Sequence, residues 1–159
     1  MSDKALREQL ADLVQNSHAH AGFDASVQGF PWDKAGVVPP GLPHSVWQLL
    51  EHMRIAQNDI LEFSRSADHV SPEWPDGYWP RSVGPGSESE WTRSLRDFRH
   101  DQQEFQRLLR DDSQDLYRAF PWGEGQTLLR EALLIVDHNS HHLGQLILVR
   151  KALGLWPES

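Results

Sequence analysis

Residues 133–149 read LLIVDHNSHHLGQLILV, an apolar run that polar residues interrupt at its centre. The apolar flanks predict a buried helix, which we expect to run from Thr127 to Leu153 and to stop at Gly154. His138 and His142 stand four residues apart, so this helix places both imidazoles on one face, with Cβ atoms roughly 6 Å apart. Both rings can then reach a single metal ion, because Zn–N bonds are about 2.0–2.1 Å long. A third ligand from another helix would complete a three-histidine site.

Three more helices follow from the helical spacing of apolar residues. The first is expected to end before Gly22. The second starts with a capping box formed by Ser45 and Gln48, and the third starts with the matching pair Ser87 and Glu90. The four expected helices span Asp3 to His20, Ser45 to Ser66, Ser87 to Leu109 and Thr127 to Leu153. They predict an all-α fold, a four-helix bundle with long loops between helices one and two and between helices two and three.

Composition limits both the architecture and the chemistry. A chain of 159 residues has the length of one domain with a sizeable core, so we expect residues 1–159 to form a single domain. The absence of cysteine excludes disulfides, thiolate ligands and an internal thiol nucleophile, so any sulfur chemistry needs an external thiol. The formal charge of -8 argues against a nucleic-acid partner, because phosphate binding rests on clustered Lys and Arg.

The chain also carries no sign of a membrane partner. Its N-terminus lacks a hydrophobic signal core, and no apolar run approaches the roughly 20 residues of a membrane span. We therefore expect a soluble, cytoplasmic protein.

Two loops are dense in proline and aromatic residues, at residues 70–80 and 120–125. Prolines preset the backbone, so both loops should be stiff. Five tryptophans stand in loops or beside proline, and we interpret them as packing over helix ends rather than as stacking on a substrate. These are Trp32, Trp74, Trp79, Trp122 and Trp156.

His52 is the candidate for the third ligand. It lies at the margin of the apolar stripe of the second helix, where it can turn inward, although a lone histidine there is more often a hydrogen-bonded boundary residue. The spacing of His138 and His142 matches the zinc-protease motif, but Asn139 stands where that motif requires a glutamate base, which excludes a metalloprotease. His141 points away from the shared face. Gly144 in mid-helix suggests a tight helix crossing, with clearance over a substrate as the less favoured alternative.

Three segments together resemble the DinB/YfiT-like superfamily: DHNSHHLGQ at residues 137–145, GQTLLRE at 125–131 and HSVWQLLEH at 44–52. The resemblance runs from the first helix to the C-terminus. It implies a four-helix bundle that holds a divalent metal, zinc or nickel, with one histidine of helix two and an H-x-x-x-H pair of the last helix. By position these ligands are His52, His138 and His142. The resemblance also implies a homodimer and, in some members, transferase or isomerase chemistry with a low-molecular-weight thiol such as bacillithiol or mycothiol.

Helical spacing gives three candidates for residues that orient the ligands. Glu131 and Gln145 lie seven residues from a ligand histidine on the same face, and Asp59 lies seven residues from His52. For the two carboxylates, ion pairs with an arginine such as Arg130 are the favoured alternative.

The remaining histidines are expected outside the site. His18 and His20 would add a fourth ligand or a proton relay if the end of helix one faced the metal, but exposed helix-terminal positions are favoured. The histidines at positions 44, 69 and 100 are interpreted as surface residues.

Two classes of function remain open. The first is a metal-dependent enzyme acting on a small molecule, either a hydrolase or a thiol transferase, because a bound metal lowers the pKa of water to about 7 and stabilises a thiolate. The second is a non-catalytic bundle in which the metal joins helices two and four and stabilises the fold by linkage.

Overall fold

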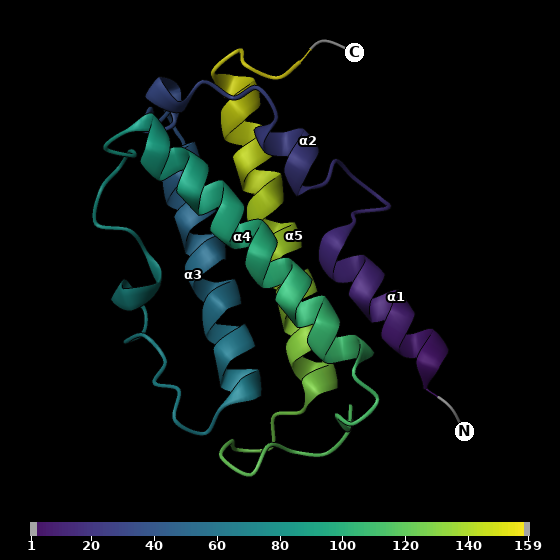
Figure 1. Cartoon of the computed structure of the whole chain (residues 1–159). Coiled ribbons are helices and arrows are strands. Elements are labelled where there is room, and N and C mark those ends of the chain that lie inside the picture. The colour runs from purple at the N-terminus through teal and green to yellow at the C-terminus, as the bar shows by residue number, and fades with distance from the viewer. Residues whose placement is uncertain (1–2, 158–159) are drawn as a thin grey trace.

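Four long helices form the body of the protein, for which the computed structural model describes residues 3–157 (Figure 1). These helices are α1 (Lys4–Gln15), α3 (Val46–Arg65), α4 (Glu88–Arg110) and α5 (Leu128–Ala152). α1 packs on α4, α4 on α3 and α3 on α5, and α5 closes the ring against α1. No strand occurs within residues 3–157, so the expected all-α four-helix bundle is confirmed.

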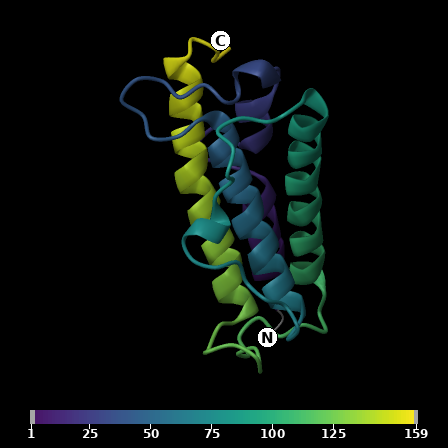
Figure 2. The same ribbon diagram turned by 90° about the vertical axis from the view of Figure 1, so that its left-hand side faces the viewer.

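Three single-turn elements lie in the connections. α2 (Phe23–Val27) and η1 (Trp32–Lys34) belong to the segment between α1 and α3, which covers the end of the bundle near the C-terminus (Figure 2). η2 (Asp76–Tyr78) belongs to the segment between α3 and α4 and lies against α3. Figure 2 shows this segment running in front of α3 and α5. It therefore adds a layer outside the groove between these two helices.

The starts of the helices follow the capping residues. Ser45 Oγ accepts a hydrogen bond from the Gln48 amide at 3.1 Å, and Gln48 Oε1 accepts one from the Ser45 amide at 3.0 Å, which confirms the capping box. Ser87 Oγ accepts from the Glu90 amide at 3.2 Å, but the Glu90 carboxylate accepts from the Gly86 amide. Only half of the second predicted box is therefore formed.

The first helix is shorter than the sequence suggests. It was expected to reach His20, but α1 ends at Gln15, and the Asn16 backbone is extended. The Asp12 carboxylate accepts hydrogen bonds from Asn16 Nδ2 at 2.7 Å and from His18 Nε2 at 2.6 Å. Asparagine side chains that bond locally in this way compete with helical hydrogen bonds. The chain then turns so that α2 can bury its own apolar face.

The core consists of two apolar clusters stacked along the bundle. One gathers around Trp47, Phe98 and Leu146, and the other gathers around Phe105 and Leu109. Met53 and Leu143 belong to the first cluster, and they directly follow His52 and His142 in the chain. Core packing on these neighbours therefore fixes the rotation of α3 and α5 at the level of the histidines. No helix within residues 3–157 combines the length and apolarity needed to cross a bilayer.

Gly144 does not mark a helix crossing, which corrects the interpretation of this residue. A Cβ added there would meet no heavy atom of the surrounding structure within 4 Å, and Gly144 is exposed. The reason is its angular position, because α5 turns Leu143 and Leu146 towards the core and leaves Gly144 on the solvent side.

Candidate metal centre

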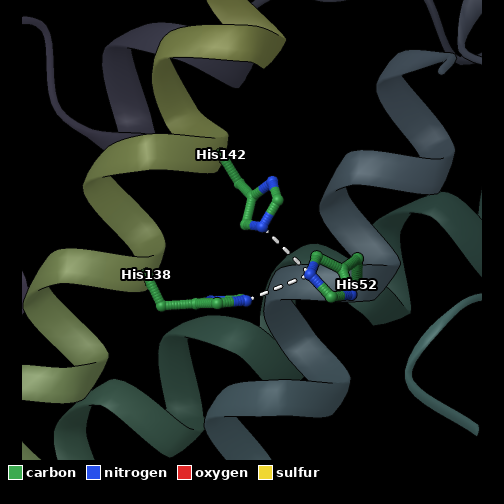
Figure 3. A group of neighbouring side chains, drawn as sticks. All are labelled: His52, His138 and His142. Atoms are coloured by element: carbon green, nitrogen blue, oxygen red, sulfur yellow. Dashed lines mark hydrogen bonds between the residues drawn. The ribbon is translucent and has the colours of Figure 1, made fainter. Parts of the chain in front are cut away.

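Three histidines from two helices meet in the groove between α3 and α5 (Figure 3). His52 comes from α3, and His138 and His142 project from successive turns of α5. The Nε2 atom of His52 lies 3.0 Å from Nε2 of His138 and 3.0 Å from Nε2 of His142. One ligand nitrogen from each ring falls within 4.8 Å of the others. The structure therefore brings together the three residues that the sequence proposed as ligands.

A backbone carbonyl determines which nitrogen of His52 carries the proton. Nδ1 of His52 lies 2.9 Å from the carbonyl oxygen of Tyr78, in η2. A carbonyl oxygen only accepts hydrogen bonds, so His52 must donate through Nδ1–H. In the neutral ring, the lone pair then sits on Nε2 and points towards α5.

A chain of amides orients His138 in the same sense. The Phe98 carbonyl accepts from Gln57 Nε2 at 2.8 Å, so Gln57 presents its oxygen to Asn139, whose Nδ2 donates to it at 2.9 Å. Asn139 consequently turns Oδ1 towards Nδ1 of His138, at 3.4 Å. This leaves Nδ1 as the protonated nitrogen and Nε2 as the one with the lone pair.

The unprotonated Nε2 atoms of His52 and His138 thus face each other at a distance of 3.0 Å. Such a contact lacks a proton to share, and the two lone pairs repel each other unless a cation lies between them. The third ring follows the same pattern, because Gln145 Oε1 lies 2.8 Å from Nδ1 of His142. All three Nδ1 atoms therefore face oxygen atoms, as is usual for histidines that bind metal through Nε2.

Burial keeps the three rings neutral. Loss of solvent lowers the pKa values of His52 and His138, and it lowers the pKa of His142 to about 4. His52 also depresses the pKa values of His138 and His142, and His138 depresses that of His142, because two positive charges this close would repel. The neutral imidazole is the form that binds a metal ion, so the donor set fits a divalent cation at neutral pH.

A family model described as the DinB superfamily matches residues 15–146. The match spans α3, α4 and all three histidines and covers more than half of the chain. The chain belongs to the DinB superfamily. No curated protein and no solved structure matches it.

Trp79 covers one side of the centre in this DinB protein. Its ring stacks on His52, with centroids 3.9 Å apart and an interplanar angle of 4°, and it meets His142 edge-on at 6.1 Å. His44 stacks on the same indole at 4.3 Å. Trp79 therefore packs, as predicted for the loop tryptophans, but it packs on a candidate ligand rather than over a helix end. His44 is part of this stack and is not the surface residue that we expected.

The three predicted orienting residues occupy different places. Gln145 contacts His142 directly. Asp59 contacts no ligand and accepts hydrogen bonds from His69 Nε2 at 2.7 Å and from the Tyr78 hydroxyl at 2.6 Å. Through these hydrogen bonds Asp59 is linked to His52 only by way of Tyr78, whose carbonyl accepts from the His52 ring.

Glu131 lies apart from the ligands. It is 2% exposed and pairs with Arg130 at 2.7 Å, the alternative that the sequence favoured for a carboxylate. Burial raises the pKa of Glu131, although the Arg130 guanidinium opposes this shift.

The other histidines stay outside the cluster. His18 and His20 are exposed and lie beyond the end of α1, where His20 Nε2 contacts Ser140 Oγ at 3.1 Å. His141 and His100 are also exposed. His69 was expected at the surface, but it is partly buried against Asp59 because the segment that follows α3 folds back along the helix.

Sequence reasoning missed the residues that fix the rings. The Tyr78 carbonyl is a backbone group in a loop without periodicity, so no residue type indicates it. Asn139 was noted only as a missing protease base, although a polar residue beside a ligand on a buried helix is a signal for an orienting role.

Proposed function

We propose that this DinB protein binds a divalent metal, zinc or nickel, through Nε2 of His52, His138 and His142, and acts with it on a small-molecule substrate. The observation that carries the proposal is the pair of facing, unprotonated Nε2 atoms of His52 and His138, 3.0 Å apart. Imidazole nitrogens bind both metals, so the donor set does not distinguish zinc from nickel, and the metal that is available determines which one is bound.

Three protein ligands are typical of catalytic rather than structural zinc sites, because they leave a coordination position open. A metal bound there would supply Lewis acidity that lowers the pKa of a coordinated water or thiol. This chemistry suits a hydrolase or a transferase that uses a low-molecular-weight thiol. Because the chain has no cysteine, that thiol would come from outside the protein.

The chain's own residues position and shield the centre. Oxygen atoms of Tyr78, Asn139 and Gln145 hold the three Nδ1 atoms, so the Nε2 lone pairs already point towards one another before a metal binds. Trp79 keeps water from one face of His52. Asp59 is already paired with His69 and Tyr78, so it serves to hold the η2 loop rather than to move a proton at the centre.

The second candidate is a non-catalytic metal-binding bundle. It is favoured by the position of the histidines, because a metal there would join α3 and α5, two helices far apart in sequence. Binding to the folded state alone would add about 4 kcal/mol to the free energy of unfolding at a metal concentration 1,000 times Kd.

Metal content tests the shared part of both candidates. Untagged wild-type protein, H52A, H138A and the control H100A, which changes an exposed histidine of α4, are passed through gel filtration without chelator and analysed for metals. We expect near-stoichiometric zinc or nickel in wild type and H100A and its loss in H52A and H138A. Wild-type protein that is free of metal and binds neither added zinc nor added nickel would contradict the proposal.

Cobalt substitution separates the two candidates. A small thiol such as cysteamine, added to cobalt-loaded protein, should change the visible spectrum if an open position exchanges ligands. An unchanged spectrum at saturating thiol would instead support the non-catalytic bundle.

A further inference from the structure

From a cavity beside the histidines we infer the substrate class: a small molecule with a metal-binding head group and an uncharged, apolar tail of about six to eight carbons. This inference rests on the proposed metal site. The cavity measures about 210 Å³ and lies between residues 42–44 and the C-terminal half of α5.

The lining of this tail cavity is mainly apolar, with Gln145 and His44 as its polar members. Leu49 of α3 and Val149 of α5 are buried and form its floor, while Leu42 and Leu148 form its walls. No Asp, Glu, Lys or Arg within the described part of the chain lines it. A charged group would lose its hydration there without gaining a partner, so the cavity selects an uncharged tail.

The tail cavity continues the groove that holds the histidines. Leu49 lies one helical turn before His52, and Gln145 and Val149 lie one and two turns after His142, so they share the faces that carry the ligands. Gln145 lines the cavity and also contacts Nδ1 of His142 at 2.8 Å.

A second connection runs through the aromatic stack. His44 lines the tail cavity and stacks on Trp79, which in turn stacks on His52. The Trp79 ring fills the space between His44 and His52, so a molecule bound at the metal through one end would extend past Gln145 into the apolar space, with His44 on its far side.

The volume limits the size of the tail. An apolar cavity of about 150 Å³ holds a benzene ring, so 210 Å³ admits a group somewhat larger than that. Drug-sized ligands occupy about 300–1,000 Å³, which exceeds this space. A second cavity, of about 180 Å³, lies between α5 and the segment after α1. Met53 and Leu143 of the core line it together with Asn139, which orients His138, but polar side chains of residues 15–20 also line it, so we do not assign the apolar tail to it.

A series of straight-chain alkyl hydroxamates tests the inference, because the head group is a metal ligand and only the tail varies. Affinities of hydroxamates with two, four, six, eight and ten carbons are measured by the visible spectrum of cobalt-loaded protein. We expect affinity to rise about threefold for each added methylene and to stop rising beyond about eight carbons.

Two variants locate the effect. Leu148 lines the tail cavity and is 52% exposed, and Leu133 is 53% exposed on the same helix but lines none of the cavities described here. Glutamate suits both exposed helical positions. We expect L148E to bind octanohydroxamate at least about tenfold more weakly, with acetohydroxamate as the internal reference, and we expect L133E to keep the full dependence on chain length.

Two results would overturn the inference while leaving the proposed metal site in place. One is equal affinity for acetohydroxamate and octanohydroxamate in the wild type, and the other is an L148E variant that keeps the same dependence on chain length. If the protein takes up no cobalt, the proposed metal site is wrong. If its cobalt spectrum does not change with any hydroxamate, the site has no open coordination position. In both cases the tail assignment fails as well.

Discussion

The two ends of the groove between α3 and α5 carry polar clusters of opposite character. At one end, His52, His138 and His142 present three nitrogen lone pairs to one another. At the other end, two helical turns away along each helix, Asp59 and Glu131 lie buried with hydrogen-bonding partners of their own. The second cluster is complete as it stands, whereas the first opposes nitrogen lone pairs with no proton between them.

The complete cluster shows what a satisfied arrangement looks like. Both Asp59 oxygens accept hydrogen bonds, from His69 and from Tyr78, and Glu131 accepts from Arg130. Burial and the Asp59 carboxylate raise the pKa of Tyr78 to about 12, so its hydroxyl remains a donor. Donors meet acceptors throughout, so this cluster stabilises the fold without a ligand. Proximity of polar groups therefore does not by itself indicate a metal site; mismatched donors and acceptors do.

The largest effect should come from removing one histidine at each end. H138A is expected to weaken zinc binding by more than about 100-fold, since even residues that only orient a ligand are worth 10–100-fold. H69A removes a partly buried histidine from the complete cluster and should keep zinc affinity within about tenfold of wild type. Isothermal titration calorimetry on the metal-free proteins provides both numbers. Equal losses in the two variants would abolish the distinction between the clusters.

Acid should weaken the metal-free fold through the histidine end of the groove. His142 has a pKa of about 4 in the folded protein, below the value of about 6.5 of a free histidine, so the unfolded chain binds a proton first. The stability that the neutral His142 ring contributes is fully present above pH 6.5 and is lost as the pH falls to about 4. The total loss is about 2–3 kcal/mol in the free energy of unfolding.

Urea unfolding of metal-free wild type and H142Q at pH 7.5 and pH 5 measures this contribution. Wild type should lose more stability than H142Q over that interval. If both proteins lose the same amount, the His142 ring is not held neutral by its surroundings.

A substitution at Gln145 tests whether the amide beside His142 contributes to metal binding. Q145A leaves all three imidazoles in place but removes the oxygen that orients His142. Zinc affinity should fall about tenfold. Q103A on α4 changes an exposed glutamine away from the groove and serves as the control. An affinity of Q145A equal to that of Q103A would show that this amide has no part in positioning the ligand.

The smallest effect on zinc affinity should come from Tyr78, which touches both clusters. Y78F removes the hydroxyl that donates to Asp59 but keeps the carbonyl that accepts from His52. We expect a loss of about 1–2 kcal/mol in the free energy of unfolding of the metal-free protein, since the buried Asp59 carboxyl group loses a hydrogen-bond donor. Zinc affinity should change by less than about threefold, because outer partners account for larger factors only when they hold a ligand. Chemical denaturation and calorimetry test the two halves of this prediction.

The sequence predicted the parts of the molecule that periodicity controls. The last three long helices start at or within one residue of the expected capping residues, and the spacing of His138 and His142 follows from helical geometry. The predicted end of α1 near His20 was wrong, because it rested on Gly22 as the stop signal, whereas local bonds of Asp12 end the helix at Gln15. Such side-chain competition leaves no periodic signal.

The surroundings of the metal centre were harder to predict for a similar reason. Tyr78 and Trp79 belong to a loop, and its course along α3 depends on tertiary contacts with Asp59 and Trp47, the latter through Ser82 at 3.1 Å. Asp59 was proposed to orient a ligand histidine, but it bonds to His69 and Tyr78 instead. Spacing on one helix does not show whether a carboxylate points to a histidine ligand or to a loop.

The central claim is that one metal ion lies between the three Nε2 atoms. It is tested most directly by crystals of the zinc-loaded protein, with diffraction data collected on both sides of the zinc absorption edge. The account predicts a single strong anomalous peak about 2.0–2.1 Å from Nε2 of His52, His138 and His142. A peak elsewhere, or no peak while His52 and His138 stay in Nε2 contact at about 3.0 Å, would contradict it.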